Sequence, residues 1–163
     1  MVAYKTPKVV TPEIPTGGWV SVDPGDVHVG VCYWIGRVPQ WAKEFDQPTF
    51  IDWLIPRIAS GEIELVVYEV FMLYHSKATQ QTGSKFFTSE LIGVMRHLCR
   101  RAKVPFHGYQ ASVHKSLYKS LEFRPPKMPL NAWVSYGNGS HCKDAECVGR
   151  WHVRVNDLKG QGF

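Results

Sequence analysis

The sequence predicts a single α/β domain built on a mixed sheet flanked by helices. Two observations lead to this fold class. An early pair of strand-like segments joined by a tight turn predicts an antiparallel hairpin, and the strand-like runs that follow alternate with helix-like runs, as in sheets with parallel strands. The length of 163 residues fits one domain. A composition that is 44% hydrophobic and 13% aromatic supplies a core and argues against global disorder.

The first half of the domain is expected to begin with the hairpin. Residues 18–23 form the first strand, Pro24-Gly25 breaks it, and residues 27–35 form the second strand. Residues 37–45 are expected to add a third strand. An amphipathic helix with its apolar positions at Phe50, Leu54 and Ile58 follows, and Pro56 is expected to shorten or kink it.

The second half is expected to alternate strands and helices. Residues 64–71 form a near-continuous apolar run of strand length, with Glu69 close to its end. The clearest helix follows, and its apolar spacing predicts a core-facing stripe of Phe87, Leu91, Val94, Leu98 and Ala102. Residues 104–109 predict another strand and residues 113–121 another helix. A final helix is expected to start near Asp144.

These elements suggest three parts of the chain. Residues 1–16 are interrupted by prolines and predict an extended arm, residues 17–156 the folded domain, and residues 157–163 a tail. No apolar stretch is long enough to span a membrane, and the first residues lack the apolar block of a signal peptide. We therefore expect a cytoplasmic protein with no membrane partner. The chain has only four cysteines, which is too few to indicate a fold held together by disulfides.

Positive charge is concentrated in one part of the sequence. Between Arg96 and Lys127 there are eight Lys or Arg residues and one acidic residue, whereas the rest of the chain holds 11 basic and 13 acidic residues. A basic segment on a near-neutral remainder is typical of a surface that binds a polyanion, because each neutralised phosphate releases counterions. The alternative is a solvated basic helix face with no nucleic-acid role.

Three acidic residues are candidates for chemistry. Asp23 and Glu69 are each expected at the carboxyl end of a strand, where ligands gather in α/β sheets, and Asp144 lies three residues after His141. Taken singly, Asp23 could cap the turn after it and Asp144 could cap the last helix, whereas a carboxylate in the apolar run around Glu69 is costly to bury unpaired. Together they suit Mg²⁺ or Mn²⁺, and the basic segment suggests a nucleic-acid substrate.

Three motifs in order resemble the RuvC-type Holliday-junction resolvases of the retroviral-integrase and ribonuclease-H-like superfamily. Val22-Asp23-Pro24-Gly25, followed by Val29-Gly30, is similar to the first strand and turn of the family. Val67-Tyr68-Glu69-Val70-Phe71 is similar to the strand that ends in the second acid, and His141-x-x-Asp144-Ala145 to the start of the last helix. The resemblance covers roughly residues 18–155. The compact size and the arm would suit a phage-encoded member.

The resemblance implies a ribonuclease-H-like mixed five-stranded sheet flanked by helices, and a metal-dependent endonuclease that resolves Holliday junctions in DNA recombination and repair. Asp23, Glu69, His141 and Asp144 would bind two Mg²⁺ or Mn²⁺ ions, with no organic cofactor. A water molecule would then hydrolyse the phosphodiester by paired nicks in branched DNA. The residues expected to contact DNA are Phe71 or Tyr74, which would stack on unpaired bases, Lys115, which would contact the scissile strand, and Arg100, Arg101 and Lys119.

The resemblance also implies a homodimer, because two opposed strands must be cut. The sequence offers an apolar surface for it on the helix after Glu69, beside the core stripe: Phe86, Ile92, Met95 and Cys99. These residues could instead widen the core stripe.

Several alternatives remain open at this stage. Cys142, Cys147 and His152, preceded by His141, could form a zinc site, although their spacing lacks the close cysteine pair of common zinc modules. The same fold could bind nucleic acid without cutting it, although retention of all the acids argues against this. A related nuclease could act on flaps, forks or single strands.

Overall fold

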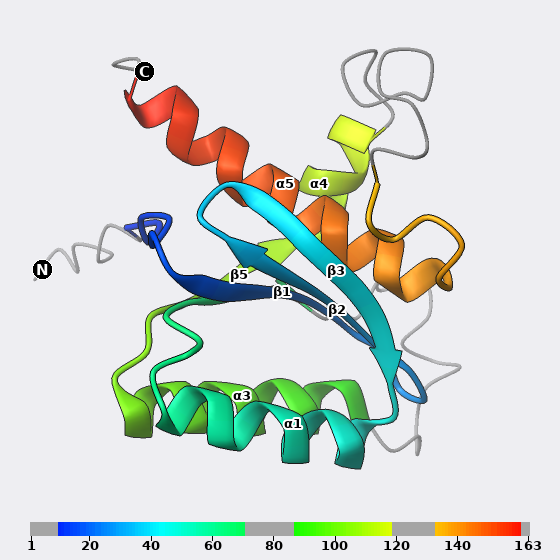
Figure 1. The fold of residues 1–163 in the computed structure, drawn as a ribbon. Helices are drawn as coiled ribbons and strands as arrows, with labels where there is room; N and C mark the ends of the chain where they lie inside the picture. Colours follow the sequence, from blue (N-terminus) through cyan, green and yellow to red (C-terminus); the bar gives the residue numbers. More distant parts are fainter. Residues whose placement is uncertain (1–9, 71–86, 119–132, 161–163) are drawn as a thin grey trace, which may run out of the picture.

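The computed structural model describes residues 10–70, 87–118 and 133–160, without the side chains of residues 115–118. Five strands and four helices form three layers, with α1 and α3 on one face of the sheet and α5 on the other, beside α4 (Figure 1). The elements are β1 (Gly18–Pro24), β2 (Val29–Ile35), β3 (Val38–Phe45), α1 (Gln47–Ala59), β4 (Val66–Val70), α3 (Phe87–Ala102), β5 (Phe106–Gln110), α4 (Ala111–Tyr118) and α5 (Ser140–Gly160).

The sheet is mixed, with the strand order β3-β2-β1-β4-β5. The first three strands form antiparallel pairs, and β4 runs parallel to both β1 and β5. The predicted α/β fold with a mixed five-stranded sheet is confirmed. β1 is buried along its whole length because it lies at the centre of the sheet and is covered on both faces.

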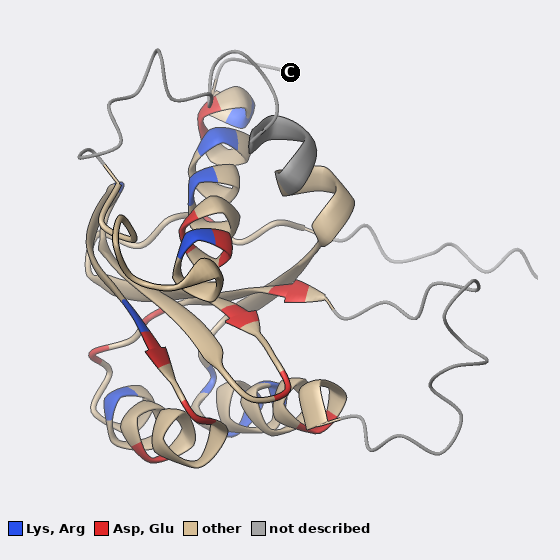
Figure 2. Cartoon of the chain, turned by 90° about the vertical axis from the view of Figure 1, so that its right-hand side faces the viewer, with Lys and Arg blue, Asp and Glu red and all other residues tan. Residues whose placement is uncertain are grey.

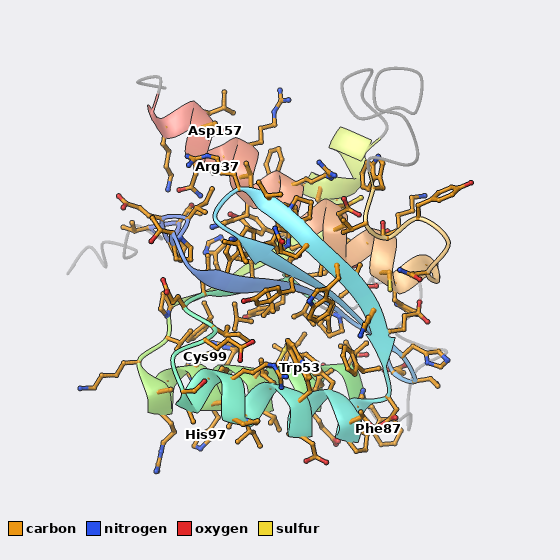
Figure 3. All side chains as sticks on the ribbon, in the orientation of Figure 1. Arg37, Trp53, Phe87, His97, Cys99 and Asp157 are labelled. Atoms are coloured by element: carbon orange, nitrogen blue, oxygen red, sulfur yellow. The ribbon has the colours of Figure 1, made fainter. Side chains whose placement is uncertain are left out.

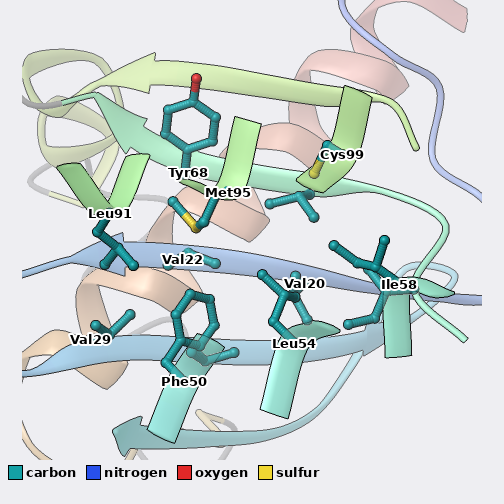
Figure 4. Close-up of a cluster of buried hydrophobic side chains, with 13 residues drawn as sticks. Val20, Val22, Val29, Phe50, Leu54, Ile58, Tyr68, Leu91, Met95 and Cys99 are labelled. Atoms are coloured by element: carbon teal, nitrogen blue, oxygen red, sulfur yellow. The ribbon is translucent and has the colours of Figure 1, made fainter. Parts of the chain in front are cut away.

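An apolar cluster fills the space between the sheet and the helices α1 and α3 (Figure 4). Val20 and Val22 face it from β1, Phe50 and Leu54 from α1, and Met95 from α3. The alternation of side chains along β1 sends these valines to one face and the intervening residues to the other.

Helix α1 continues past Pro56, which was expected to shorten or kink it. The Asp46 side chain accepts a hydrogen bond from the Thr49 backbone N–H and caps the start of the helix. The helix continues to Ala59, so Pro56 does not shorten it. Pro56 is solvent-exposed in the last turn, and its carbonyl still accepts the Ser60 N–H at 2.9 Å, so only the one hydrogen bond of the missing N–H is lost.

The expected core stripe of α3 is correct at Leu91, which is buried, and at Leu98, which packs against the core, and wrong at Phe87, Val94 and Ala102, which are exposed. The buried residues are Thr88, Leu91, Met95 and Cys99, whereas Phe87 and Val94 are 44% and 43% exposed. Thr88 is buried because its backbone N–H and its hydroxyl both donate to the Asp26 carboxylate in the turn after β1. This polar anchor rotates the helix away from the phase that its apolar residues indicate.

The expected dimer surface on α3 is therefore wrong where the structure describes it. Met95 and Cys99 are buried in the core, and Ile92 packs against it. Phe86 lies outside the described residues. Figure 3 shows Cys99 on the side of α3 that faces the sheet and His97 on the outer side.

Helix α5 covers the other face of the sheet. Trp19 and Trp34 stack at a centroid distance of 4.9 Å and form, with residues of α5, a second buried cluster. Polar contacts join this cluster: the Ser21 hydroxyl donates to the Ala145 carbonyl at 2.6 Å and accepts from the Trp34 indole N–H at 2.9 Å. Ser21 and Asp23 lie on the same face of β1, so α5 is attached two residues from the candidate site.

Helix α5 is longer than expected at both ends. It begins at Ser140, four residues before Asp144, because the Glu44 carboxylate of β3 accepts the His141 backbone N–H at 3.1 Å. Asp144 therefore lies in the second turn and does not cap the helix. The helix ends at Gly160, beyond residue 156, and the exposed pair Arg37 and Asp157 connects it to the β2–β3 hairpin (Figure 3).

Part of the expected arm lies against the same helix. Ile14 packs against the second cluster, and the carbonyls of Thr11 and Pro12 accept hydrogen bonds from the side chains of Lys159 and Asn156. Within the described ranges, no helix is long and apolar enough to cross a membrane. The four cysteines are free and buried.

Candidate active site

Asp23 and Glu69 meet at the carboxyl end of two parallel neighbouring strands. Val22 of β1 is in register with Tyr68 of β4, so the next residues along both strands, Asp23 and Glu69, lie side by side. Both point to the face covered by α5, because Val22 and Tyr68 point into the apolar cluster on the opposite face. Figure 2 shows acidic residues at the tips of neighbouring strands. The structure therefore places both acids at the carboxyl edge of the sheet where the sequence predicted them.

The start of α5 places His141 directly on Asp23. The His141 Nδ1 lies 2.7 Å from the Asp23 Oδ2, and the imidazole is about one-third exposed. This approach requires a glycine at Gly30, the partner of Asp23 on β2, since a Cβ there would overlap the His141 backbone carbonyl. Gly30, which the sequence motif includes, thus has a structural role in the site.

Asp23 is in an environment that disfavours its charge. Burial raises the pKa of its carboxyl from the ordinary 3.8 to about 6, and the negative charge of Glu69 adds to the increase. The charge of Asp144 acts in the same direction, whereas the hydrogen bond and the charge of His141 lower the pKa. The structure therefore places Glu69 and His141 beside Asp23, and Asp144 lies close enough for its charge to act on Asp23.

His114 of α4 is a site residue that the sequence did not indicate. Its side chain is fully buried, and its Nε2 lies 2.8 Å from the Glu69 Oε2. Its Nδ1 is buried and has no hydrogen-bond partner within the described part of the chain. The sequence interpretation chose the neighbouring Lys115, whose side chain is not described. The signal that could have identified His114 is a histidine one turn after a strand that adjoins the Glu69 strand.

Two further acids support the site from outside it. Glu44 holds the first turn of α5 through the His141 N–H, and Asp26 holds the first turn of α3 through Thr88. Neither was a candidate, because each acts on a helix more than 60 residues away in the sequence. Their effect is to fix both helix starts at the same edge of the sheet as Asp23.

The donor set has the chemistry of a divalent-metal site, with carboxylate oxygens and one imidazole around a partly buried position. A cation there would offset the burial and the charges of Glu69 and Asp144 that raise the pKa of Asp23. Within the described ranges, however, no three His, Cys, Asp or Glu side chains are arranged to hold a metal ion, and His141 occupies an oxygen of Asp23. The residues fit a metal by their chemistry, and Asp23, Glu69, Asp144 and His141 are those that would hold it.

Two of the predicted DNA-contacting residues, Arg100 and Arg101, lie away from this edge. Arg100 and Arg101 lie in the last turn of α3, whose first turn is fixed beside Asp26. A helix of 16 residues spans about 24 Å, so these arginines lie near the opposite edge of the sheet. Arg100 lies over the Phe106 ring, 5.6 Å from its centroid. Phe71, Tyr74 and Lys119 fall outside the described residues.

The zinc alternative finds no support in the geometry. Cys142 and Cys147 are five residues apart on α5 and so point about 140° away from each other around the helix. Burial raises the pKa of both thiols to about 12, which favours the protonated form that does not bind zinc. The His152 Nδ1 lies 2.8 Å from the Tyr109 hydroxyl, so this nitrogen already has a hydrogen-bond partner that is not a cysteine.

Comparison with solved structures identifies the fold. The chain is similar to RuvC from T. thermophilus in complex with a Holliday junction substrate, with a TM-score of 0.65 and 14% identity over 88% of this chain and 96% of that chain. It is also similar to the Thermus thermophilus RuvC structure, with a TM-score of 0.59 and 14% identity over 87% and 96% of the two chains. No family model and no curated protein matches the sequence. At this identity the similarity establishes the fold, and the expected ribonuclease-H-like fold is confirmed.

Proposed function

We propose that this chain is a divalent-metal-dependent endonuclease that cuts branched DNA, with four-way junctions as its substrate. The observation that carries the proposal is the approach of Glu69, Asp144 and His141 to Asp23 at one edge of the sheet, where burial and the charges of Glu69 and Asp144 raise the pKa of Asp23 to about 6. The shared fold adds support, since one of the similar structures is a RuvC complex with a Holliday junction substrate.

Each residue of the set has a distinct part in this proposal. Divalent cations, when bound, supply activation of water and stabilisation of the leaving oxygen in phosphodiester hydrolysis. Asp23 is central because both Glu69 and Asp144 act on its charge, and the three carboxylates would together hold the cations. His141 contacts the Asp23 Oδ2 at 2.7 Å and is about one-third exposed, so its imidazole would be a further ligand beside Asp23.

His114 would fix the orientation of Glu69. A ring N–H that donates to a metal-binding carboxylate leaves the other carboxylate oxygen turned toward the metal, and such supporting residues are worth about 10–100-fold in activity or metal affinity. We expect His114→Ala to lose this much in cleavage and in Mn²⁺ affinity measured by calorimetry. His114→Gln, which keeps an N–H near the position of Nε2, should recover part of both. Equal loss in the two variants would assign His114 to packing alone.

The function is tested with labelled four-way, fork, flap, duplex and single-stranded DNA, with and without Mg²⁺. The parent protein should cut the four-way junction only with Mg²⁺, and Asp23→Asn should lose more than about a hundredfold of that activity while still binding DNA, since the loss should exceed that of a supporting residue. Asp52→Asn, an identical change at an exposed position of α1, is the matched control.

The outcomes separate the alternatives. Preference for flaps, forks or single strands would replace the junction substrate, and binding without cleavage under every condition would make the chain a passive binder. If Asp23→Asn cut as fast as the parent, the assignment of the acidic set would be wrong.

Paired nicks need two active sites, so we propose a homodimer on the junction. Sedimentation at micromolar concentration should give a two-fold assembly, and mixing parent chains with Asp23→Asn chains should give single nicks in place of paired ones. A strict monomer, both free and on DNA, would favour a nuclease of flaps or forks.

The basic segment is proposed to contact DNA phosphates, with Arg100, Arg101, Lys115 and Lys119 as candidates. Because Arg100 and Arg101 lie near the edge opposite Asp23, they would contact DNA at a distance from the cut. Replacing both by Gln should reduce the slope of log affinity against log salt by about 2 if both contact phosphates. An unchanged slope would identify them as a solvated helix face.

A further inference from the structure

A second concave site lies beside the candidate active site, in the segment that leads into α5. It has a volume of about 260 Å³ and is lined by Trp133, Tyr136 and Lys143 together with residues 137–139. The volume is just below the range of about 300–1,000 Å³ typical of pockets for drug-sized ligands. Its size therefore suits a ligand of about one ring.

The pocket is rigidly built. The Glu146 carboxylate, which is fully buried on α5, accepts hydrogen bonds from the Ser135 backbone N–H at 3.0 Å and from the Ser135 hydroxyl at 2.7 Å. Arg150 pairs with the same carboxylate and lies over the Trp133 ring, 4.6 Å from its centroid. Gly137, at a φ of 81°, makes the turn that leaves Tyr136 64% exposed. These contacts hold the segment in place before any ligand arrives.

The pocket is also continuous with the catalytic edge of the sheet. The Asn138 side chain donates to the Ala42 carbonyl of β3 at 3.0 Å, and Gly139 packs against the Glu44 carboxylate that accepts the His141 N–H. Lys143 is next to Asp144 in the sequence and also lines the pocket. These contacts connect the pocket to the end of β3 and to the turn of α5 that carry groups of the candidate site.

We propose that this pocket binds one unpaired nucleobase next to the scissile phosphate, an inference that rests on the proposed function. An exposed aromatic ring accepts a base of any identity by stacking, and a nearby cation attracts the backbone that carries the base. The combination of Tyr136, the apolar wall of Trp133 and Lys143 meets both requirements. Such a contact fixes which phosphate of a branched substrate reaches the acids.

The experiment measures stacking directly, without cleavage. A fluorescent adenine analogue, 2-aminopurine, is placed at successive positions near the centre of a four-way junction, and its emission is recorded with the parent protein in EDTA. Stacking on Tyr136 quenches one position selectively. Tyr136→Ala should abolish this quenching and weaken DNA binding about tenfold, whereas Tyr136→Phe should keep both because the ring remains.

Matched controls test whether the pocket itself is responsible. Phe87→Ala removes an exposed aromatic ring on the opposite face of the sheet and should leave the quenching unchanged. Lys143→Ala should weaken binding, whereas Lys159→Ala, at the far end of the same helix, should have a smaller effect. With Mg²⁺, the Tyr136→Ala protein should cut at several neighbouring phosphates where the parent cuts at one.

The result can overturn this proposal separately from the proposed function. If the parent cuts junctions in Mg²⁺ but Tyr136→Ala gives the same quenching at every position, the nucleobase pocket is wrong and the nuclease assignment stands. If the parent binds DNA with quenching that depends on Tyr136 but never cuts, the pocket stands and the nuclease assignment is wrong. Absence of DNA binding would overturn both.

Discussion

On one face of the sheet, α1 and α3 pack through a cluster that is almost entirely apolar, whereas on the other face α5 packs through apolar residues joined by buried polar groups. The buried polar residues on the α5 face include Ser21, Glu146 and His152, each with a hydrogen-bond partner. The α1 and α3 face has its polar anchors at its border, where Asp26 and Asp46 hold the helix starts.

The difference indicates a division of roles. Apolar packing is tolerant of small displacements, whereas hydrogen bonds fix direction and distance. The α5 face carries His141 and Asp144 and faces Asp23, so it needs a fixed helix position. The face covered by α1 and α3 carries none of the four candidate residues, and its packing only has to bury apolar surface. Substitutions on the α1 and α3 face should therefore lower stability alone, whereas loss of the polar contacts on the α5 face should lower both stability and cleavage.

The largest effect is expected from breaking the buried ion pair on the α5 face. Arg150→Met leaves the Glu146 carboxylate buried without its cation, which costs about 3–5 kcal/mol in the free energy of unfolding. Chemical denaturation measures it. The control is Arg37→Met, which removes an exposed ion pair with Asp157 and should cost no more than about 1 kcal/mol. Similar costs in the two variants would contradict the importance of burial.

A core truncation on the apolar face should be nearly as costly. Leu54→Ala removes a fully buried side chain and should lower the free energy of unfolding by about 2–5 kcal/mol, without changing the cleavage rate of the molecules that remain folded. Ile55→Ala, at the exposed neighbouring position, should stay within about 0.5 kcal/mol of the parent. Loss of cleavage in folded Leu54→Ala would show that this face also positions the site.

The same contrast explains what could be predicted from sequence. The strands and the edge that carries Asp23 and Glu69 were predictable, because apolar runs, alternation and turn residues are local signals. The phase of α3 was not, since it depends on the hydrogen bonds from Thr88 to Asp26, a contact between residues 62 positions apart.

Polar contacts across the fold account for the other differences. The start of α5 depends on Glu44, and the participation of His114 depends on the neighbouring position of β5 and β4. Neither has a local signature. Asp144 was a candidate because it could complete a set of three carboxylates, and the role of His141 as a ligand came only from the resemblance to a known motif.

A smaller effect on the free energy of unfolding is expected below neutral pH, from the titration of His152. Burial lowers the pKa of His152 to about 4, with added contributions from the charges of His107 and Lys159, so the histidine is neutral in the folded protein. The pKa of His152 is lower in the folded protein than in the unfolded chain. Its contribution to stability is therefore present above about pH 6.5 and is lost as the pH falls toward 4. The loss should reach about 3 kcal/mol.

This titration is isolated by comparing the parent with His152→Gln across that window. The difference in the free energy of unfolding between the two proteins should shrink as the pH falls from 6.5 to 4. The raised pKa of Asp23 acts in the opposite direction, because its carboxyl takes up a proton more readily in the folded state, but it is common to both proteins and cancels. A difference independent of pH would mean that His152 is not the responsible group.

The smallest loss of stability is expected from Ser21→Ala, which should nevertheless reduce cleavage strongly. Ser21→Ala leaves the Ala145 carbonyl and the Trp34 indole N–H buried without their partner, which costs about 1–3 kcal/mol. Ala145 follows Asp144, so the loss also frees the turn of α5 that carries the third acid. We expect cleavage by the folded variant to fall about tenfold or more, within the range for residues that support metal ligands. Leu54→Ala is the matched comparison, since it costs at least as much stability and should leave cleavage unchanged. If both variants cut DNA at the parent rate when fully folded, the polar contacts of the α5 face would serve stability alone.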